Sequence, residues 1–425
     1  MPLLPRRLAV AVAVAAPLRR PLCTAAPRPP WAMVNSQAAL DVSGAPSQSA
    51  RALVDLNTTP CVSHLSVPTR LVAPHGDDMG SLVGIVRDAS SDGLLLLDFI
   101  DARHRPLWPH EFAAARGGVE SEGKLFVCNP LSGQLVRLPA PGMDVPKMGS
   151  TSFGLLTQSQ GSHGPPDRYV VAQLSKISRG GGEWRRVVRR FLSETGEWDE
   201  RPLVGELASN HIMDPGRSMM INHEVLVFGD RLWWLDVAWG ACSVDPFSDR
   251  PERRFAELPR SSVQPVSDSP TLSRYRRMGV SEGKLRYVQV SHGPKHDKWC
   301  VILSFSLDDE TYSWALDHGV EITDRHDPCY VQIAAIDPFN ADLVYLQHGS
   351  AVIAMDLAKG KEIWRGYLAK EFVFQKLLHC SLLVPCVLPT WLATSNIPSA
   401  GTLSSNKADC KRKTLADMLV RVDKC

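Results

Sequence analysis

Short apolar runs separated by turn-forming residues dominate the sequence between residues 51 and 375. Most runs are rich in Val, Leu, Tyr and Trp and abut Gly, Pro, Asp or Asn, as in Gly93–Asp98, Arg168–Leu174, Val225–Phe228, Arg231–Asp236, Trp299–Ser306, Leu343–Leu346 and Ser350–Asp356. Such runs are typical of β-strands. Only Pro109–Arg116 has helical character within this region. A parallel α/β fold is therefore disfavoured, because it needs a helix between most strands.

Turn-and-strand units recur along this region. Ser121–Leu125 (Ser-Glu-Gly-Lys-Leu) is repeated at Ser281–Leu285, 160 residues later. A second unit leads from an acidic or Asn turn into a strand, and three of its four copies end on Trp: Cys128–Pro139, Ser193–Trp198, Leu307–Trp314 and Met355–Trp364. A third pair, Val244–Phe247 and Ile336–Phe339, shares Asp-Pro-Phe. These units indicate β-hairpins, because Asp, Asn and Gly tolerate tight turns.

The repeats predict an all-β fold, a β-propeller-like ring of about six to eight small antiparallel sheets. A spacing of 160 residues corresponds to three or four blades, at the roughly 40–50 residues typical of propeller repeats. Radial repetition also protects sheet edges. Two β-sandwiches are the alternative. We expect residues 51–425 to form a single propeller-like domain, with a segment after about residue 376 closing the last blade.

Residues 1–50 differ in composition and predict a disordered targeting leader and linker. The first 40 residues contain five Arg, no Lys and no acidic residue, around an Ala- and Val-rich run. Arg-rich, acid-free leaders resemble organellar transit peptides, because cationic segments favour a negative-inside membrane potential. We expect a mitochondrial location. The chloroplast, secretion, and the cytoplasm or nucleus stay open as alternatives.

Composition excludes several classes of protein. Lys and Arg total 47 against 45 Asp and Glu, which excludes a globally basic nucleic-acid binder. Hydrophobic residues make up 44% of the chain, which excludes wholesale disorder. The ten cysteines form no CxxC pair, so we expect buried thiols in a reducing compartment rather than a zinc site. No apolar run approaches the ~20 residues of a membrane-spanning helix.

The sequence carries no catalytic signature. It lacks the G-x-S-x-G nucleophile turn, the GxxxxGK[ST] phosphate loop and the HExxH zinc motif. We therefore predict no catalytic residue, no cofactor or cofactor-binding residue and no metal ligand, which argues against an enzyme. Two polar loop regions leave one enzymatic alternative open, a site in the central channel built from His292, His296, His318 or Asp324.

Two residue groups mark a possible interaction surface: Trp233, Trp234 and Trp239 in one segment, and Arg185, Arg186, Arg189 and Arg190 around a Val-Val pair. An exposed tryptophan can anchor a protein interface. Arginines beside aromatic rings can also bind single-stranded RNA, which makes RNA binding in an organelle an alternative. The other interpretation places the tryptophans in the core and balances the arginines against nearby acidic residues.

The segment Arg231–Pro259, with its Trp-Trp pair and Asp-Pro-Phe, resembles the hallmark of a large plant family catalogued as domain of unknown function 1618. The likeness spans roughly residues 50–425 and includes Val127–Gly133, Arg274–Tyr287, Asp337–Asn340 and Ile397–Ser405. It implies a plant nuclear-encoded protein and transfers no catalytic or ligand residue. The units are also similar to those of kelch and F-box-associated propellers, although we find no F-box-like Leu-Pro segment near the N-terminus.

Together these observations predict a non-enzymatic propeller-like scaffold that binds a protein partner. The sequence does not indicate which partner it binds or its oligomeric state.

Overall fold

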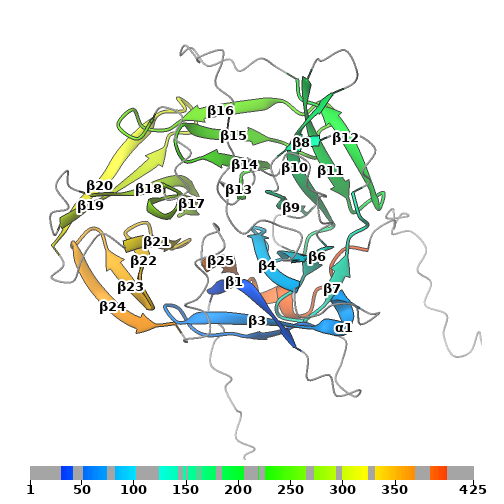
Figure 1. Cartoon of the computed structure of the whole chain (residues 1–425), viewed down its shortest axis with the longest axis horizontal. Coiled ribbons are helices and arrows are strands. Elements are labelled where there is room, and N and C mark those ends of the chain that lie inside the picture. The colour runs from blue at the N-terminus through cyan, green and yellow to red at the C-terminus, as the bar shows by residue number, and fades with distance from the viewer. Residues whose placement is uncertain are drawn as a thin grey trace, which may run out of the picture.

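The computed structural model describes residues 30–41, 51–73, 82–101, 124–141, 147–149, 152–159, 161, 164–178, 184–204, 219, 225–264, 272–292, 299–323, 331–368 and 383–399. These residues form small antiparallel sheets arranged in a ring (Figure 1). The helical segments are the short α1 (Thr69–Val72), α3 (Leu272–Tyr275) and η4 (Thr390–Ala393). Within the described ranges, no helix is long and apolar enough to cross a membrane. The helical candidate at 109–116 lies outside them.

Five blades follow one another along the chain. Blade 1 contains β4 (Leu82–Ala89), β5 (Leu95–Asp101), β6 (Lys124–Cys128) and β7 (Leu135–Arg137). Blade 2 contains β8 (Lys147–Gly149), β9 (Gly154–Gln158), β10 (Arg168–Ser178), β11 (Trp184–Leu192) and β12 (Glu197–Pro202). Blade 3 contains β13 (Val225–Phe228), β14 (Arg231–Asp236), β15 (Gly240–Val244) and β16 (Arg253–Glu257). Blade 4 contains β17 (Arg276–Ser281), β18 (Lys284–His292), β19 (Trp299–Leu307) and β20 (Trp314–Thr323). Blade 5 contains β21 (Val331–Ile336), β22 (Leu343–His348), β23 (Ala351–Asp356) and β24 (Lys361–Tyr367).

A closing blade joins the two ends of the described chain. It contains β25 (Leu383–Val387), β1 (Trp31–Asp41), β3 (Val62–Pro68) and β2 (Leu53–Asp55). β1 pairs antiparallel with β25 and parallel with β3. Only two residue pairs link β1 to β4, so the continuous eight-stranded sheet divides into the closing blade and blade 1. The described residues thus form six blades, within the predicted range of six to eight.

The innermost strands prove that the ring is closed. β4, β9, β13, β17, β21 and β25 each contact the next strand in this order, and β25 contacts β4. Each blade therefore has a neighbour on both faces, and its middle strands are covered on both sides. The all-β propeller predicted from the repeats is confirmed.

β1 corrects the predicted boundary of the leader. Residues 1–50 were expected to be leader and linker, but Trp31–Asp41 is a strand of the closing blade. Its first four residues, Trp31 to Val34, are buried against neighbouring strands. The assignment was wrong for these eleven residues because the Arg-rich composition conceals a β-type run that starts at Trp31. Residues 1–29 and 42–50 lie outside the described residues.

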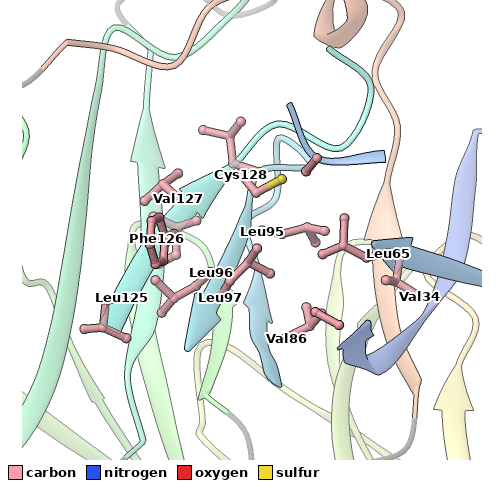
Figure 2. Packing of buried hydrophobic residues seen from close by; sticks show 14 of the residues in the cluster. Val34, Leu65, Val86, Leu95, Leu96, Leu97, Leu125, Phe126, Val127 and Cys128 are labelled. Carbon is pink, nitrogen blue, oxygen red and sulfur yellow. The ribbon is translucent and has the colours of Figure 1, made fainter. Parts of the chain in front are cut away.

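The core explains why some strands are apolar on both faces. Leu95, Leu96 and Leu97 of β5 are all fully buried, although successive side chains point to opposite faces. Figure 2 shows them between Phe126 and its neighbours on β6 and Leu65 of the closing blade. A strand enclosed on both faces reads as a continuous apolar run rather than an alternating one.

The predicted hairpins connect the third and fourth strands of their blades. Asn129 accepts backbone N–H bonds from Leu131 (3.0 Å) and Ser132 (3.1 Å), and Gly133 then adopts φ 70°. Asp308 and Asp356 make equivalent bonds in blades 4 and 5. The Ser-Glu-Gly-Lys-Leu copies are not equivalent in this sense, because Lys284 opens the second strand of its blade and Lys124 opens the third. That pentapeptide marks local turn chemistry rather than blade register.

Candidate interaction surface between blades 2 and 3

The three predicted tryptophans lie in the core. Trp233, Trp234 and Trp239 are 3%, 0% and 4% exposed. Trp234 donates its indole N–H to the carbonyl of Ser152 in blade 2 (3.1 Å), while Trp233 packs on the opposite face of β14. Because β14 is covered by a blade on each side, neither face is available to a partner. The predicted interaction surface therefore loses these three residues.

The four predicted arginines alternate along β11. Val188 packs with Cys242 and Val244 of blade 3, so Arg186 and Arg190, on the same side of the pleat, also face blade 3. Arg185 and Arg189 occupy the other face. Arg189 is buried and forms an ion pair with Glu200 on β12 (3.5 Å), whereas Arg185 is exposed.

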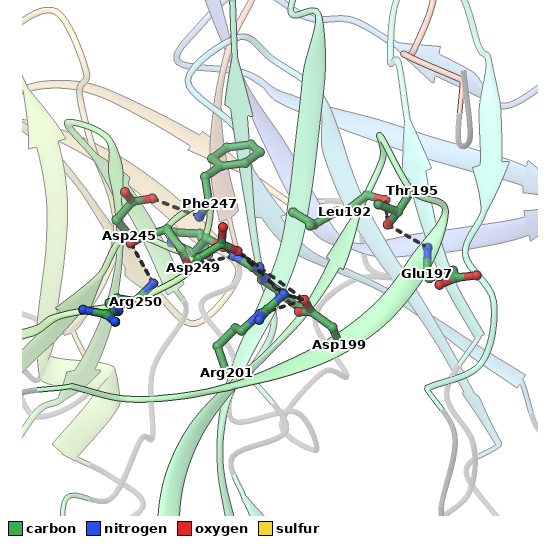
Figure 3. Close-up of polar contacts among 12 residues, drawn as sticks. Leu192, Thr195, Glu197, Asp199, Arg201, Asp245, Phe247, Asp249 and Arg250 are labelled. Atoms are coloured by element: carbon green, nitrogen blue, oxygen red, sulfur yellow. Dashed lines mark hydrogen bonds and ion pairs between the residues drawn. The ribbon is translucent and has the colours of Figure 1, made fainter. Parts of the chain in front are cut away.

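Arg190 fastens blade 2 to blade 3 rather than facing solvent. Its guanidinium, 1% exposed, donates to Asp199 on β12 (2.7 Å), to the carbonyls of Pro246 and Ser248 (both 2.8 Å) and to Asp249 (3.1 Å). Figure 3 shows Asp199 and Asp249 meeting at this network, with Arg201 beside them. Burial disfavours the charged guanidinium, but the bonds and charges of the two carboxylates outweigh burial and raise the pKa of Arg190.

The Asp-Pro-Phe segments have one structural role in two blades. Asp245 accepts the backbone N–H of Phe247 (2.9 Å), which shapes the turn that presents the Pro246 and Ser248 carbonyls to Arg190. Asp337 accepts the N–H of Phe339 in the same way (2.9 Å). The repeat is therefore a side-chain-stabilised turn.

A second set of contacts joins blades 2 and 3 farther along β11. The backbone N–H of Leu203 donates to the carbonyl of Arg186 (3.1 Å). Val204 then donates to Pro251 (3.0 Å) and accepts from the N–H of Arg253 (3.3 Å). These bonds bring Arg186, Val204 and Arg253 together, and Val204 is 47% exposed. We name these three residues the junction surface.

The junction surface holds two unmatched cations. Among the described residues, neither Arg186 nor Arg253 has an ion pair, and the buried Nε of Arg253 has no hydrogen-bond acceptor. Arg253 shares its face of blade 3 with Val244, its cross-strand partner, so it faces Arg186. Burial lowers the pKa of Arg253, and the positive charge of Arg186 lowers it further. Sequence reasoning missed Arg253, because only the register of β15 and β16 shows which way it points.

The structure does not support a central-channel site for His318. His318 lies on β20, the outermost strand of blade 4, and its Nε2 is 2.8 Å from Asp342 Oδ1. The side chain of His292, and residues His296 and Asp324, lie outside what the structure describes. In the described part of the chain, no group of three His, Cys, Asp or Glu side chains could hold a metal ion.

A small pocket of about 60 Å³ lies on blade 1 between Lys124, Arg137 and the segment 138–141. It is well below the roughly 300–1,000 Å³ of sites for small organic ligands.

The sequence of blades also matches a known family. A family model described as F-box protein At3g26010-like, beta-propeller, matches residues 71–371. The chain belongs to this family. The At3g26010-like match, to a plant β-propeller family, covers blades 1 to 5 and leaves the closing-blade strands β1, β2, β3 and β25 outside it.

Other likenesses are shorter or more distant. A stretch of 48 residues is 48% identical to the DNA replication and repair protein RecF of Porphyromonas gingivalis, covering 11% of this chain and 13% of that protein. A chain of the Mitotic Checkpoint Complex crystal structure is 10% identical at a TM-score of 0.30, over 66% of this chain and 63% of that chain. The Cps50 (Swd1) beta-propeller domain of Myceliophteria thermophila is 10% identical at a TM-score of 0.30, over 68% of this chain and 83% of that chain.

Proposed function

We propose that this chain is a non-enzymatic scaffold that binds a protein partner through the junction surface. The observation that carries the proposal is the half-exposed Val204 between two arginines that have no acidic partner within the described residues. An apolar contact flanked by arginine is typical of the centre of a protein interface. A β-propeller suits such a role, because its closed ring holds surface residues in fixed positions.

The outer rim offers further apolar contacts. Large exposed side chains lie on the outermost strands of three blades, at Leu53, Leu316, Ile363 and Tyr367. Outermost strands also carry backbone groups that lack a partner strand, and proteins often use such edges for binding. These side chains are separated along the rim, whereas the junction surface combines an apolar residue with two charges.

The proposal is tested by replacing Val204 in the full-length protein. Proximity labelling in plant cells would compare wild type, Val204→Asp and Leu316→Asp, which changes a similarly exposed residue on β20. We expect Val204→Asp to lose specific neighbours that Leu316→Asp keeps, because the added carboxylate pairs with the arginines and removes the apolar contact. A neighbour set unchanged by Val204→Asp, or reduced equally by both variants, contradicts the proposal.

RNA binding in an organelle is a weaker second function, supported by the same unmatched arginines. The tryptophans that would stack bases are buried, which removes the platform that such binding uses. We also propose, from the Arg-rich first 40 residues, that the protein is directed to the mitochondrion. The likeness of Arg231–Pro259 supports a further proposal, that the chain belongs to the group catalogued as domain of unknown function 1618.

A further inference from the structure

The arginines between blades 2 and 3 fall into two classes. Arg190 and Arg201 share the carboxylates of Asp199 and Asp249, so positive charge is matched at that end of β11. Four residues away, Arg186 and Arg253 face one another with no carboxylate at ion-pair distance among the described residues. Holding two like charges together in a partly buried site costs free energy unless an anion binds there.

We propose that Arg186 and Arg253 bind the phosphate of a phosphorylated side chain on the protein partner. This inference rests on the proposed function, since the same partner would cover Val204. The Nε of Arg253 supplies an unused buried donor, and guanidinium groups bind phosphate oxygens through paired N–H bonds.

Charge favours a phosphate monoester over a carboxylate. One carboxylate carries a single charge and leaves one of the two cations unmatched. A phosphorylated side chain carries about −1.5 to −2 charges at neutral pH and three acceptor oxygens, which can serve both guanidinium groups. The phosphodiester of RNA again has one charge per phosphate, and the exposed apolar neighbour here, Val204, has no ring on which a base could stack.

Binding can be measured on the full-length protein with inorganic phosphate as the probe. Spectra of ¹⁵N-labelled arginine Nε–H groups would be titrated with phosphate, with acetate at equal ionic strength, and with oligouridine. We expect saturable shifts of Arg253 with phosphate at pH 7.5, absent with acetate, and an affinity that falls as pH drops through about 6, where phosphate monoesters lose their second charge.

Two methionine variants give the control. Arg253→Met should weaken phosphate binding about tenfold or more, the loss expected for a charged hydrogen-bonded pair. Arg254→Met should leave binding unchanged, because Arg254 lies on the opposite face of β16 and contacts Tyr312 (3.4 Å). Equal effects of both variants, equal binding of acetate, or tighter binding of oligouridine than of phosphate would overturn the inference.

The two proposals fail separately. If Arg253 does not bind phosphate but Val204→Asp still loses its neighbours, the phosphate inference is wrong and the scaffold function stands. If phosphate binds at Arg253 but Val204→Asp loses no neighbour, the scaffold function fails, and so does the inference that the phosphate is carried by a protein.

Discussion

Individual residues set the turns and the closest contacts of this propeller. Gly133, Gly196 and Gly360 adopt positive φ in the hairpins of blades 1, 2 and 5, where a side chain would be strained. Blade 4 places Tyr312 at the corresponding position, with φ 53°. Its hydroxyl lies 3.4 Å from Arg254 of blade 3, so a contact between blades accompanies the strained backbone.

Gly93 is a residue at which backbone strain and close packing coincide. Its φ is 82°, and an added Cβ would lie 2.2 Å from the carbonyl oxygen of Val387 in the closing blade. We expect Gly93→Ala to lower the free energy of unfolding by roughly 2–5 kcal/mol, from backbone strain plus overpacking. Gly349→Ala (φ 60°, open space) should cost about 1–2 kcal/mol from strain alone. Equal losses in denaturant titrations would show that β25 does not pack against Gly93 in solution.

Strands and their side chains fasten each blade to the next. Trp198 of β12 donates its indole N–H to Pro139 at the end of blade 1, and Trp314 of β20 donates to Glu257 of blade 3, both at 2.7 Å. The recurring Trp after the hairpin therefore joins neighbouring outer strands. Buried arginines act similarly, since Arg276 of blade 4 donates to the Val237 and Ser262 carbonyls of blade 3 (both 2.6 Å).

The role of the recurring Trp can be separated from its size. Trp314→Phe keeps a ring but loses the bond to Glu257, and we expect a loss of about 1 kcal/mol or slightly more in unfolding free energy. Trp364→Phe is the matched variant in blade 5, where the indole nitrogen makes no hydrogen bond within the described residues, and it should cost less. Urea denaturation of both variants would test this. A larger loss for Trp364→Phe would contradict the assigned role.

At the scale of the whole molecule, the ring depends on a strand from each end of the described chain. β1 pairs with β25 from Trp31 to Asn35 and contributes buried Trp31, Met33 and Val34. Burying side chains of this size contributes about 1.5–3 kcal/mol each. The sum is a large part of the roughly 5–15 kcal/mol that stabilises a typical folded protein.

Two truncations test the closure of the ring. The described blades contain none of residues 1–29, so we expect a chain starting at residue 30 to unfold cooperatively at the wild-type temperature. A chain starting at residue 42 lacks β1 and should lose cooperative unfolding, because β25 then has no strand to pair with beyond the inner ring. Calorimetry would compare the two. Identical transitions would show that β1 is dispensable for closure.

Local chemistry alone determined the class of this fold. Strand-length runs, the turns at Asn129, Asp308 and Asp356, and the Asp-Pro-Phe turns depend on residues close in the chain, so their sequence predicted them together with the number of blades. The At3g26010-like match agrees with this prediction and likewise leaves the closing blade outside.

Tertiary structure decided which side chains are available. Trp234 and Arg190 look like interface residues along the chain, yet the neighbouring blades cover them. Arg186 and Arg253 lie far apart in sequence and meet only because two blades pack face to face with their strands in a particular register. Composition also assigned Trp31 to the leader, whereas its pairing with Val387 makes it part of the core. Burial and charge matching depend on contacts between distant segments, which local patterns do not specify.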